Sequence, residues 1–249
     1  VDTGNITING SQNYGLRIPN LTTLLDTYYQ NTLINGSILQ PGNGIEVKGT
    51  QNVGVSISKK ISAGTDLIGN ITNLNVLVNG VNGIGILRRA DFDATQNQDM
   101  ILNSAVVQSL DFGANANGSV LIRSDRFKTI LDRDITINTG IGNNVVMQSN
   151  GTGTSVVLAG TRAITLGTGA GTSVALLSSN AGSLINNGSL FINGGNSQGI
   201  AVMTTSSGTN SGAITVAGDN SVGVYNAGTF NMTSGSVDSA AKNGVGIYS

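Results

Sequence analysis

Short runs of alternating aliphatic and small polar residues recur along the chain, and Gly, Asn or Ser separates them. In Ala213-Ile214-Thr215-Val216, for example, Ile214 and Val216 would point to one side of a β-strand and Thr215 to the other. Gly and Asn between the runs supply the left-handed backbone conformations that tight corners need. The pattern predicts a succession of short strands joined by turns.

The runs repeat at a fixed interval in the last third of the chain. Gly199, Gly223 and Gly246 begin equivalent runs, and the run Ser189–Ile192 returns as Ala213–Val216. The period is about 24 residues, which accommodates three short strands with their turns and fits one coil of a β-solenoid. A leucine-rich repeat would need Leu at fixed spacings, and a trimeric β-roll head would have a shorter repeat.

We therefore predict an all-β protein: one continuous right-handed parallel β-helix over residues 1–249, with coils of about 24 residues. Stacked asparagines at one corner can hydrogen-bond from coil to coil and form a ladder. The candidate corner residues are Asn143, Asn144, Asn186, Asn187, Asn193, Asn210, Asn220 and Asn226.

Two segments break the pattern and are predicted to be non-repeat insertions. Residues 16–41 contain both prolines and an apolar run with helical spacing, which indicates a loop with a short helix, either a cap over exposed core or a protruding element. Residues 88–134 contain 13 of the 25 charged residues, with mixed signs. A solvated face with local ion pairs explains this second segment, and a recognition surface is the alternative, since exposed loops on rigid scaffolds often bind ligands.

Composition limits the chemistry that the chain can perform. Charged residues make up 10 % and aromatic residues 4 % of the chain, the net charge is −1, and Cys, His and Trp are absent. Nucleic-acid binding needs a basic stripe, which this sequence lacks. Disulfides and thiolate metal sites need Cys, and the commonest general base and metal ligand is His. We expect no bound metal, no cofactor and no helical membrane span.

The carboxylates give little support for catalysis. Polysaccharide-cleaving β-helices use clustered carboxylates, and inverting glycosidases need two of them with room for a water between. The only close pairs are Asp91 with Asp93 and Asp132 with Asp134, and neither has a distal partner that the sequence identifies. We expect that the protein is not an enzyme and assign no catalytic residue, while a polysaccharide-cleaving activity stays a minor alternative.

Six ordered segments carry a resemblance to a known family. Residues 6–11, 13–20, 28–37 and 48–56 read ITINGS, NYGLRIPN, YYQNTLINGS and KGTQNVGVS, and residues 220–225 and 243–248 read NSVGVY and NGVGIY. The set resembles the passenger domains of the large fusobacterial type V autotransporter adhesins. The resemblance implies an exported passenger on the bacterial cell surface, at the outer membrane. It also implies adhesion to a host receptor or glycan and coaggregation with other bacteria.

Two functional hypotheses follow from these observations. In the first, the chain is an adhesion module, a monomer whose two insertions contact a host receptor, a glycan or a partner bacterial surface. In the second, it is a purely structural spacer that presents a distal tip. For the first hypothesis the candidate ligand-binding residues are Arg17, Tyr28, Tyr29, Arg88, Arg89, Asp91, Asp93, Arg123 and Arg126.

Overall fold

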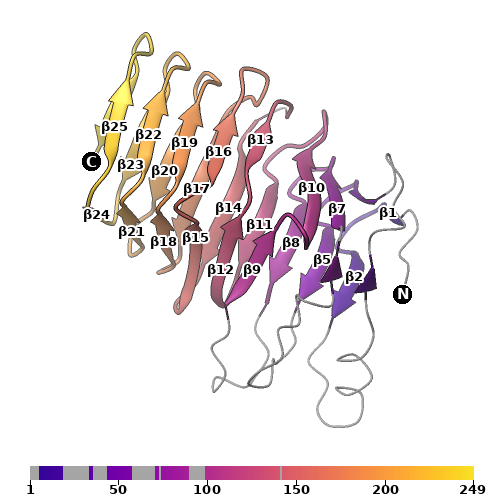
Figure 1. The fold of residues 1–249 in the computed structure, drawn as a ribbon. Helices are drawn as coiled ribbons and strands as arrows, with labels where there is room; N and C mark the ends of the chain where they lie inside the picture. Colours follow the sequence, from indigo (N-terminus) through magenta and orange to yellow (C-terminus); the bar gives the residue numbers. More distant parts are fainter. Residues whose placement is uncertain are drawn as a thin grey trace.

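The protein is a parallel β-solenoid. A computed structural model describes residues 6–18, 34–35, 44–57, 71–72, 74–89, 99–140 and 142–249, to which all structural statements here refer. These residues form 26 β-strands and no helix. The strands stack in register along one axis, so that the first and last strands lie at opposite ends of the molecule (Figure 1). The predicted all-β solenoid is confirmed.

One face of the solenoid is a nine-stranded parallel sheet, here called the long sheet, to which every coil contributes one strand. Its strands are β2 (Tyr14–Ile18), β5 (Val53–Ile57), β8 (Ile84–Arg88), β11 (Val120–Ser124), β14 (Asn144–Asn150), β17 (Ser173–Ser179), β20 (Gln198–Val202), β23 (Val222–Asn226) and β26 (Val245–Tyr248).

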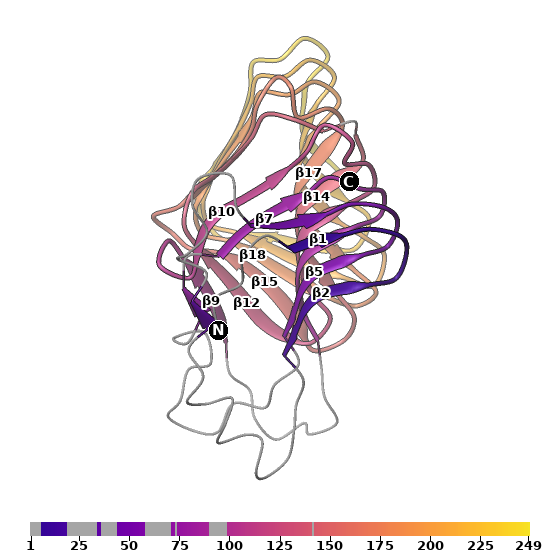
Figure 2. The same ribbon diagram turned by 90° about the vertical axis from the view of Figure 1, so that its right-hand side faces the viewer.

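The chain then passes through a second and a third face before it returns to the long sheet (Figure 2). The second face holds β3 (Ile34–Asn35), β6 (Ile71–Thr72), β9 (Met100–Asn103), β12 (Phe127–Asp132), β15 (Thr154–Leu158), β18 (Ser183–Asn186), β21 (Ser207–Asn210) and β24 (Thr229–Met232). The third face holds β1 (Ile6–Ile8), β4 (Ile45–Val47), β7 (Leu74–Val78), β10 (Val107–Phe112), β13 (Ile135–Ile137), β16 (Ala163–Leu166), β19 (Ser189–Ile192), β22 (Ala213–Val216) and β25 (Ser236–Ser239).

The core is a narrow column of stacked aliphatic side chains. In the long sheet one inward-facing position is filled from coil to coil by branched or linear apolar residues that are fully covered, and burial of such side chains drives folding. This explains why the sequence needs so few aromatic residues. The row at this long-sheet position consists of Val55, Ile86, Ile122, Met147, Leu176, Ile200 and Val224.

A polar ladder fixes the corner that precedes the long sheet. At this corner a buried Asn or Ser oxygen accepts the backbone N–H of the equivalent residue one coil earlier, as from Gly83 to Ser119 Oγ (2.9 Å) and from Ser119 to Asn144 Oδ1 (3.0 Å). The preceding residue lies in the left-handed region in most coils, for example Asn143 (φ 55°) and Asn220 (φ 57°). Asparagine tolerates this region better than most residues. The predicted corner role of Asn143, Asn144 and Asn220 is confirmed.

The coils are longer near the N-terminus than the sequence period predicted. Equivalent residues are 39 apart between the first two coils, and 23 to 24 apart only in the last coils. The mean spacing is about 27 residues, so the predicted 24 holds only for the last coils. The extra residues follow long-sheet strands, at 19–33, 58–70 and 89–99, where later coils have turns of two to four residues.

The two predicted insertions have different outcomes. Of residues 16–41, 16–18 belong to β2 and 34–35 form β3, while the expected short helix lies outside the described residues. Residues 88–134 contribute strands β9 to β12 from residue 100 onward. Strands β11 and β12 pair in register with coils on both sides, β9 pairs with β12 and β10 pairs with β7, so the prediction of non-repeat structure is wrong there. The charged side chains lie on ordinary strands, as Arg123 and Lys128 do, or in the short turns between them, as Arg126 does, which is why charge density did not mark an insertion.

Candidate functional site

Two arginines and a tyrosine converge on the exposed surface of the first coils. The guanidinium of Arg17 lies 5.7 Å from the centroid of the Tyr14 ring, and the Nη1 of Arg89 donates to the Tyr14 hydroxyl at 3.1 Å. Tyr14 keeps 39 % of its surface exposed. Strand β2 presents Tyr14 and Arg17, and Arg89 follows β8 two coils later. We call these three residues the Tyr14 cluster.

The cations of the Tyr14 cluster differ from four other cations among the described residues, Lys48, Arg123, Lys128 and Arg162, each of which pairs with a carboxylate. Arg123 pairs with Asp125 at 2.6 Å and Arg162 with Asp132 at 2.7 Å. By contrast, Arg17 and Arg89 contact no carboxylate within the described residues. Both arginines are exposed. A planar guanidinium without an internal partner can bind a carboxylate, sulfate or phosphate in a bidentate manner.

Arg88 was predicted to bind a ligand, but the structure places its side chain in the interior. It is only 2 % exposed, and its guanidinium lies 5.5 Å from the centroid of the Phe127 ring. It occupies a buried long-sheet position whose neighbours along the axis are Ile57 and Ser124. A surface ligand cannot reach it, so this prediction is wrong. Arg88 and Arg89 point to opposite sides because successive residues of a strand alternate.

The remaining predicted residues do not join the Tyr14 cluster. Arg123 is half-buried and held by Asp125, whose carboxylate also accepts from the side chain of Asn150 at 3.1 Å. Arg126 is exposed in the turn between β11 and β12. Tyr28, Tyr29, Asp91 and Asp93 lie outside the described residues.

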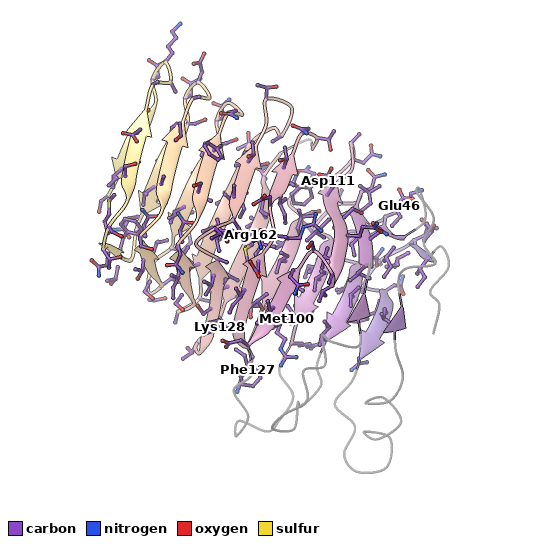
Figure 3. The ribbon with its side chains drawn as sticks, in the orientation of Figure 1. Glu46, Met100, Asp111, Phe127, Lys128 and Arg162 are labelled. Carbon is purple, nitrogen blue, oxygen red and sulfur yellow. The ribbon has the colours of Figure 1, made fainter. Side chains whose placement is uncertain are left out.

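The third face carries a second polar group near the N-terminal end. Glu46 accepts from Lys48 Nζ at 3.0 Å and from Asn79 Nδ2 at 3.0 Å. Partial burial opposes ionisation of Glu46, but these hydrogen bonds and the Lys48 charge outweigh it and lower its pKa. Asp111 lies two strands further along the same row (Figure 3). Burial raises the pKa of Asp111, and a hydrogen bond from the Phe112 N–H partly offsets this rise.

Of the carboxylates considered for catalysis, the two that the structure describes serve structural contacts. Asp132 binds Arg162, and Asp134 accepts the Ala163 N–H at 2.8 Å. Across the described ranges, no group of three or more acidic side chains is placed to hold a metal ion.

Comparisons with known proteins give no match: no protein family, no curated protein and no solved structure is significantly similar to this chain. None of the described elements is a helix long and apolar enough to cross a membrane.

Sequence reasoning selected Arg17 and Arg89 but missed Tyr14, which connects them. The available signal was local: a tyrosine at the start of a strand, three residues before an arginine, in a sequence with only five tyrosines. The contact with Arg89 spans 75 residues and has no local signal.

Proposed function

We propose that this protein is a cell-surface adhesion module, and that the Tyr14 cluster binds an acidic group of a surface glycan on a host cell or a partner bacterium. The supporting observation is the exposed Tyr14 ring, contacted by two arginines from separate coils that have no carboxylate partner among the described residues. The resemblance of the ordered N-terminal segments to fusobacterial adhesin passengers agrees with this proposal.

The geometry suits an acidic sugar in two respects. Each guanidinium offers paired N–H donors to a carboxylate or sulfate, and the tyrosine offers an apolar ring edge to the sugar carbons. Tyr14 and Arg17 stand on strand β2, and Arg89, which directly follows β8, is tied to the long sheet by its N–H bond to Ile57 O at 2.9 Å. This hydrogen-bonded backbone holds the three side chains in place before a ligand arrives, which lowers the entropic cost of binding.

Biolayer interferometry with immobilised glycans tests the proposal. We expect the chain to bind 3′-sialyllactose and 3′-sulfated lactose and not neutral lactose. Hydrogen bonds to charged groups contribute about 1.5–3 kcal/mol, so loss of one arginine should weaken binding roughly tenfold or more. Arg17→Gln and Arg89→Gln should each have this effect, and Lys242→Gln, at an exposed cation on the far end, should not. Equal binding to all three glycans, or unchanged binding by both arginine variants, refutes the proposed site.

A structural spacer is the second candidate. After Arg162 the chain carries only three charged residues, Asp219, Asp238 and Lys242, and its coils are the shortest and most regular. A plain rod needs no more than this. Loss of cell adhesion on replacing the first three coils by copies of the last three would favour the adhesion module, and unchanged adhesion would favour the spacer.

A further inference from the structure

We propose that Lys48 and Asn79 form an intramolecular isopeptide bond between neighbouring coils, and that Glu46 promotes its formation. The bond joins Nζ of Lys48 to Cγ of Asn79 and releases ammonia. The three residues belong to the polar group on the third face, so the proposal does not depend on the proposed adhesion function. The chain is then both the catalyst and the product of its own cross-linking.

The register of the third face places the two reacting side chains next to each other. Val47 pairs with Val78, and the N–H of Asn79 donates to Val47 O at 2.8 Å. Lys48 and Asn79 therefore occupy equivalent positions of neighbouring coils, whose backbones lie about 4.8 Å apart. The long, flexible stem of a lysine spans this separation.

Glu46 contacts both reacting groups. Its Oε2 lies 3.0 Å from Lys48 Nζ, and its Oε1 accepts from Asn79 Nδ2 at 3.0 Å. One carboxylate thus touches the amine that attacks and the amide nitrogen that leaves (Glu46 is labelled in Figure 3). Both distances suit a general acid–base catalyst. The lowered pKa of Glu46 keeps it ionised and ready to accept a proton.

The carboxamide of Asn79 is held and polarised from the following coil. Its Oδ1 accepts the backbone N–H of Asn115 at 3.0 Å. A donor at this distance stabilises the negative charge that develops on a carbonyl oxygen under attack. Gly113 lies against the same carboxamide, so closely that an added Cβ would overlap Asn79 Oδ1. The carboxamide is therefore fixed before the reaction, which lowers the entropic part of the barrier.

The reaction needs no oxidant, reductant or co-reactant. Glu46 takes one proton from the Lys48 ammonium group, and the neutral Nζ attacks Cγ of Asn79. Glu46 passes this proton, and then a second one from Nζ, to Nδ2. The Nζ–Cγ bond remains, the Cγ–Nδ2 bond breaks, and Nδ2 leaves as an ammonium ion. Glu46 returns to its carboxylate form.

The bond would secure one junction between coils. Each coil of a solenoid contacts only its neighbours, so the rod can open at any junction between them. The cross-link ties the coil that contains β4 to the coil that contains β7. These coils would stay joined even when the hydrogen bonds between β4 and β7 open.

Mass spectrometry of the intact chain tests the proposal. The Lys48 side chain is 44 % exposed, and a lysine must lose its proton before it attacks. We therefore expect a slow reaction that is faster at about pH 9 than at about pH 7. Glu46 and Asp111 are the charged residues on the four strands of this sheet. The chain should progressively lose the mass of one ammonia molecule.

Tryptic digestion locates the bond. Trypsin cleaves after an unmodified lysine, so it should no longer cut after Lys48, and the peptide that contains Lys48 should stay joined to the one that contains Asn79. Ring closure of Asn79 onto the nitrogen of Gly80 releases ammonia as well. That reaction leaves the cleavage after Lys48 intact and needs no lysine, so the digest separates the two.

Three variants complete the test. Lys48→Arg should abolish the cross-link, and Glu46→Gln should slow its formation about 100-fold or more. Lys128→Arg is the matched control, because Lys128 also pairs with a carboxylate, Asp99, at 2.7 Å, but its neighbour in the next coil is Ser155 and not an asparagine. This variant should cross-link like the unmodified chain. Circular dichroism checks that all variants fold. Loss of ammonia that persists in Lys48→Arg, or no loss from the unmodified chain after long incubation at about pH 9, overturns the proposal.

Discussion

The corner ladder provides a controlled test of how much a buried hydroxyl contributes to this fold. Ser119 and Ser149 are both fully buried serines on the same chain. Ser119 Oγ accepts from Gly83 N–H at 2.9 Å and donates to Gly80 O at 2.8 Å. Ser149 Oγ has no hydrogen-bond partner among the described residues. The same substitution to alanine therefore removes a bonded hydroxyl in one case and an unbonded one in the other.

We expect Ser119→Ala to destabilise the protein by about 2–3 kcal/mol. The substitution leaves the buried Gly83 N–H without an acceptor, which costs about 1–3 kcal/mol, and it also removes the bond to Gly80 O. The Gly80 carbonyl keeps a weaker bond from Asn117 N–H at 3.3 Å, which limits the loss. For a chain of this length, the melting temperature should fall by about 4–12 °C. Ser149→Ala should leave it unchanged or raise it slightly, because a buried polar group without a partner disappears.

Hydrogen exchange monitored by mass spectrometry is the appropriate assay, together with thermal melting. Solenoids can unfold one region at a time, so a single global midpoint can miss a local effect. Ser119→Ala should speed exchange in peptides that cover Gly83 and the adjoining strands, and peptides from the last coils should be unaffected. Equal effects of the two alanine substitutions would refute the claim that the ladder hydrogen bonds, rather than burial, stabilise the corner.

Three further predictions concern packing and charge. Gly212→Ala should unfold or severely destabilise the protein in a urea titration, because an added Cβ would overlap a carbonyl oxygen of the preceding coil. Gly160→Ala should be tolerated, because an added Cβ there would make only ordinary van der Waals contact with Asn187. Asp111→Asn should raise the melting temperature at pH 7, where wild type holds a desolvated carboxylate of raised pKa. This gain in melting temperature should fade as the pH falls through the raised pKa towards the ordinary Asp value, because the neutral acid carries no desolvation penalty. A gain that stays constant with pH would contradict the prediction. Ile200→Ala should cost about 2–5 kcal/mol and Ile247→Ala clearly less, because only the first is fully buried.

Those parts of the fold that depend on local pattern could be predicted. Alternation in Ala213–Val216 identified a strand with Ile214 and Val216 inward, and both are fully buried. Asn143 and Asn220 were identified as corners because few other residues adopt the left-handed backbone there. These features repeat at a short, regular interval, so one chain segment predicts the next.

What depends on coil length could not be predicted. The Tyr14–Arg89 contact requires the spacings of the first three coils, which the 24-residue period of the last coils does not supply. The inward position of Arg88 has no local sign, because either of two adjacent arginines could face solvent. The charges between residues 100 and 134 belong to regular strands and the short turns that join them, and their abundance resembled that of an insertion only because the later coils carry so few.

The constant corner also has a consequence for how such a chain can be altered. The passage from the third face into the long sheet takes five to seven residues in every coil, while the passage from the long sheet to the second face varies from two residues to fifteen. Closing a longer connection costs little, since each doubling of its length adds only about 0.6 kcal/mol. Each coil therefore has one connection of nearly constant length and one connection that tolerates large changes of length. Foreign peptides grafted after Asn150, Ser179 or Val202 should be displayed in a row without shifting any strand beneath them.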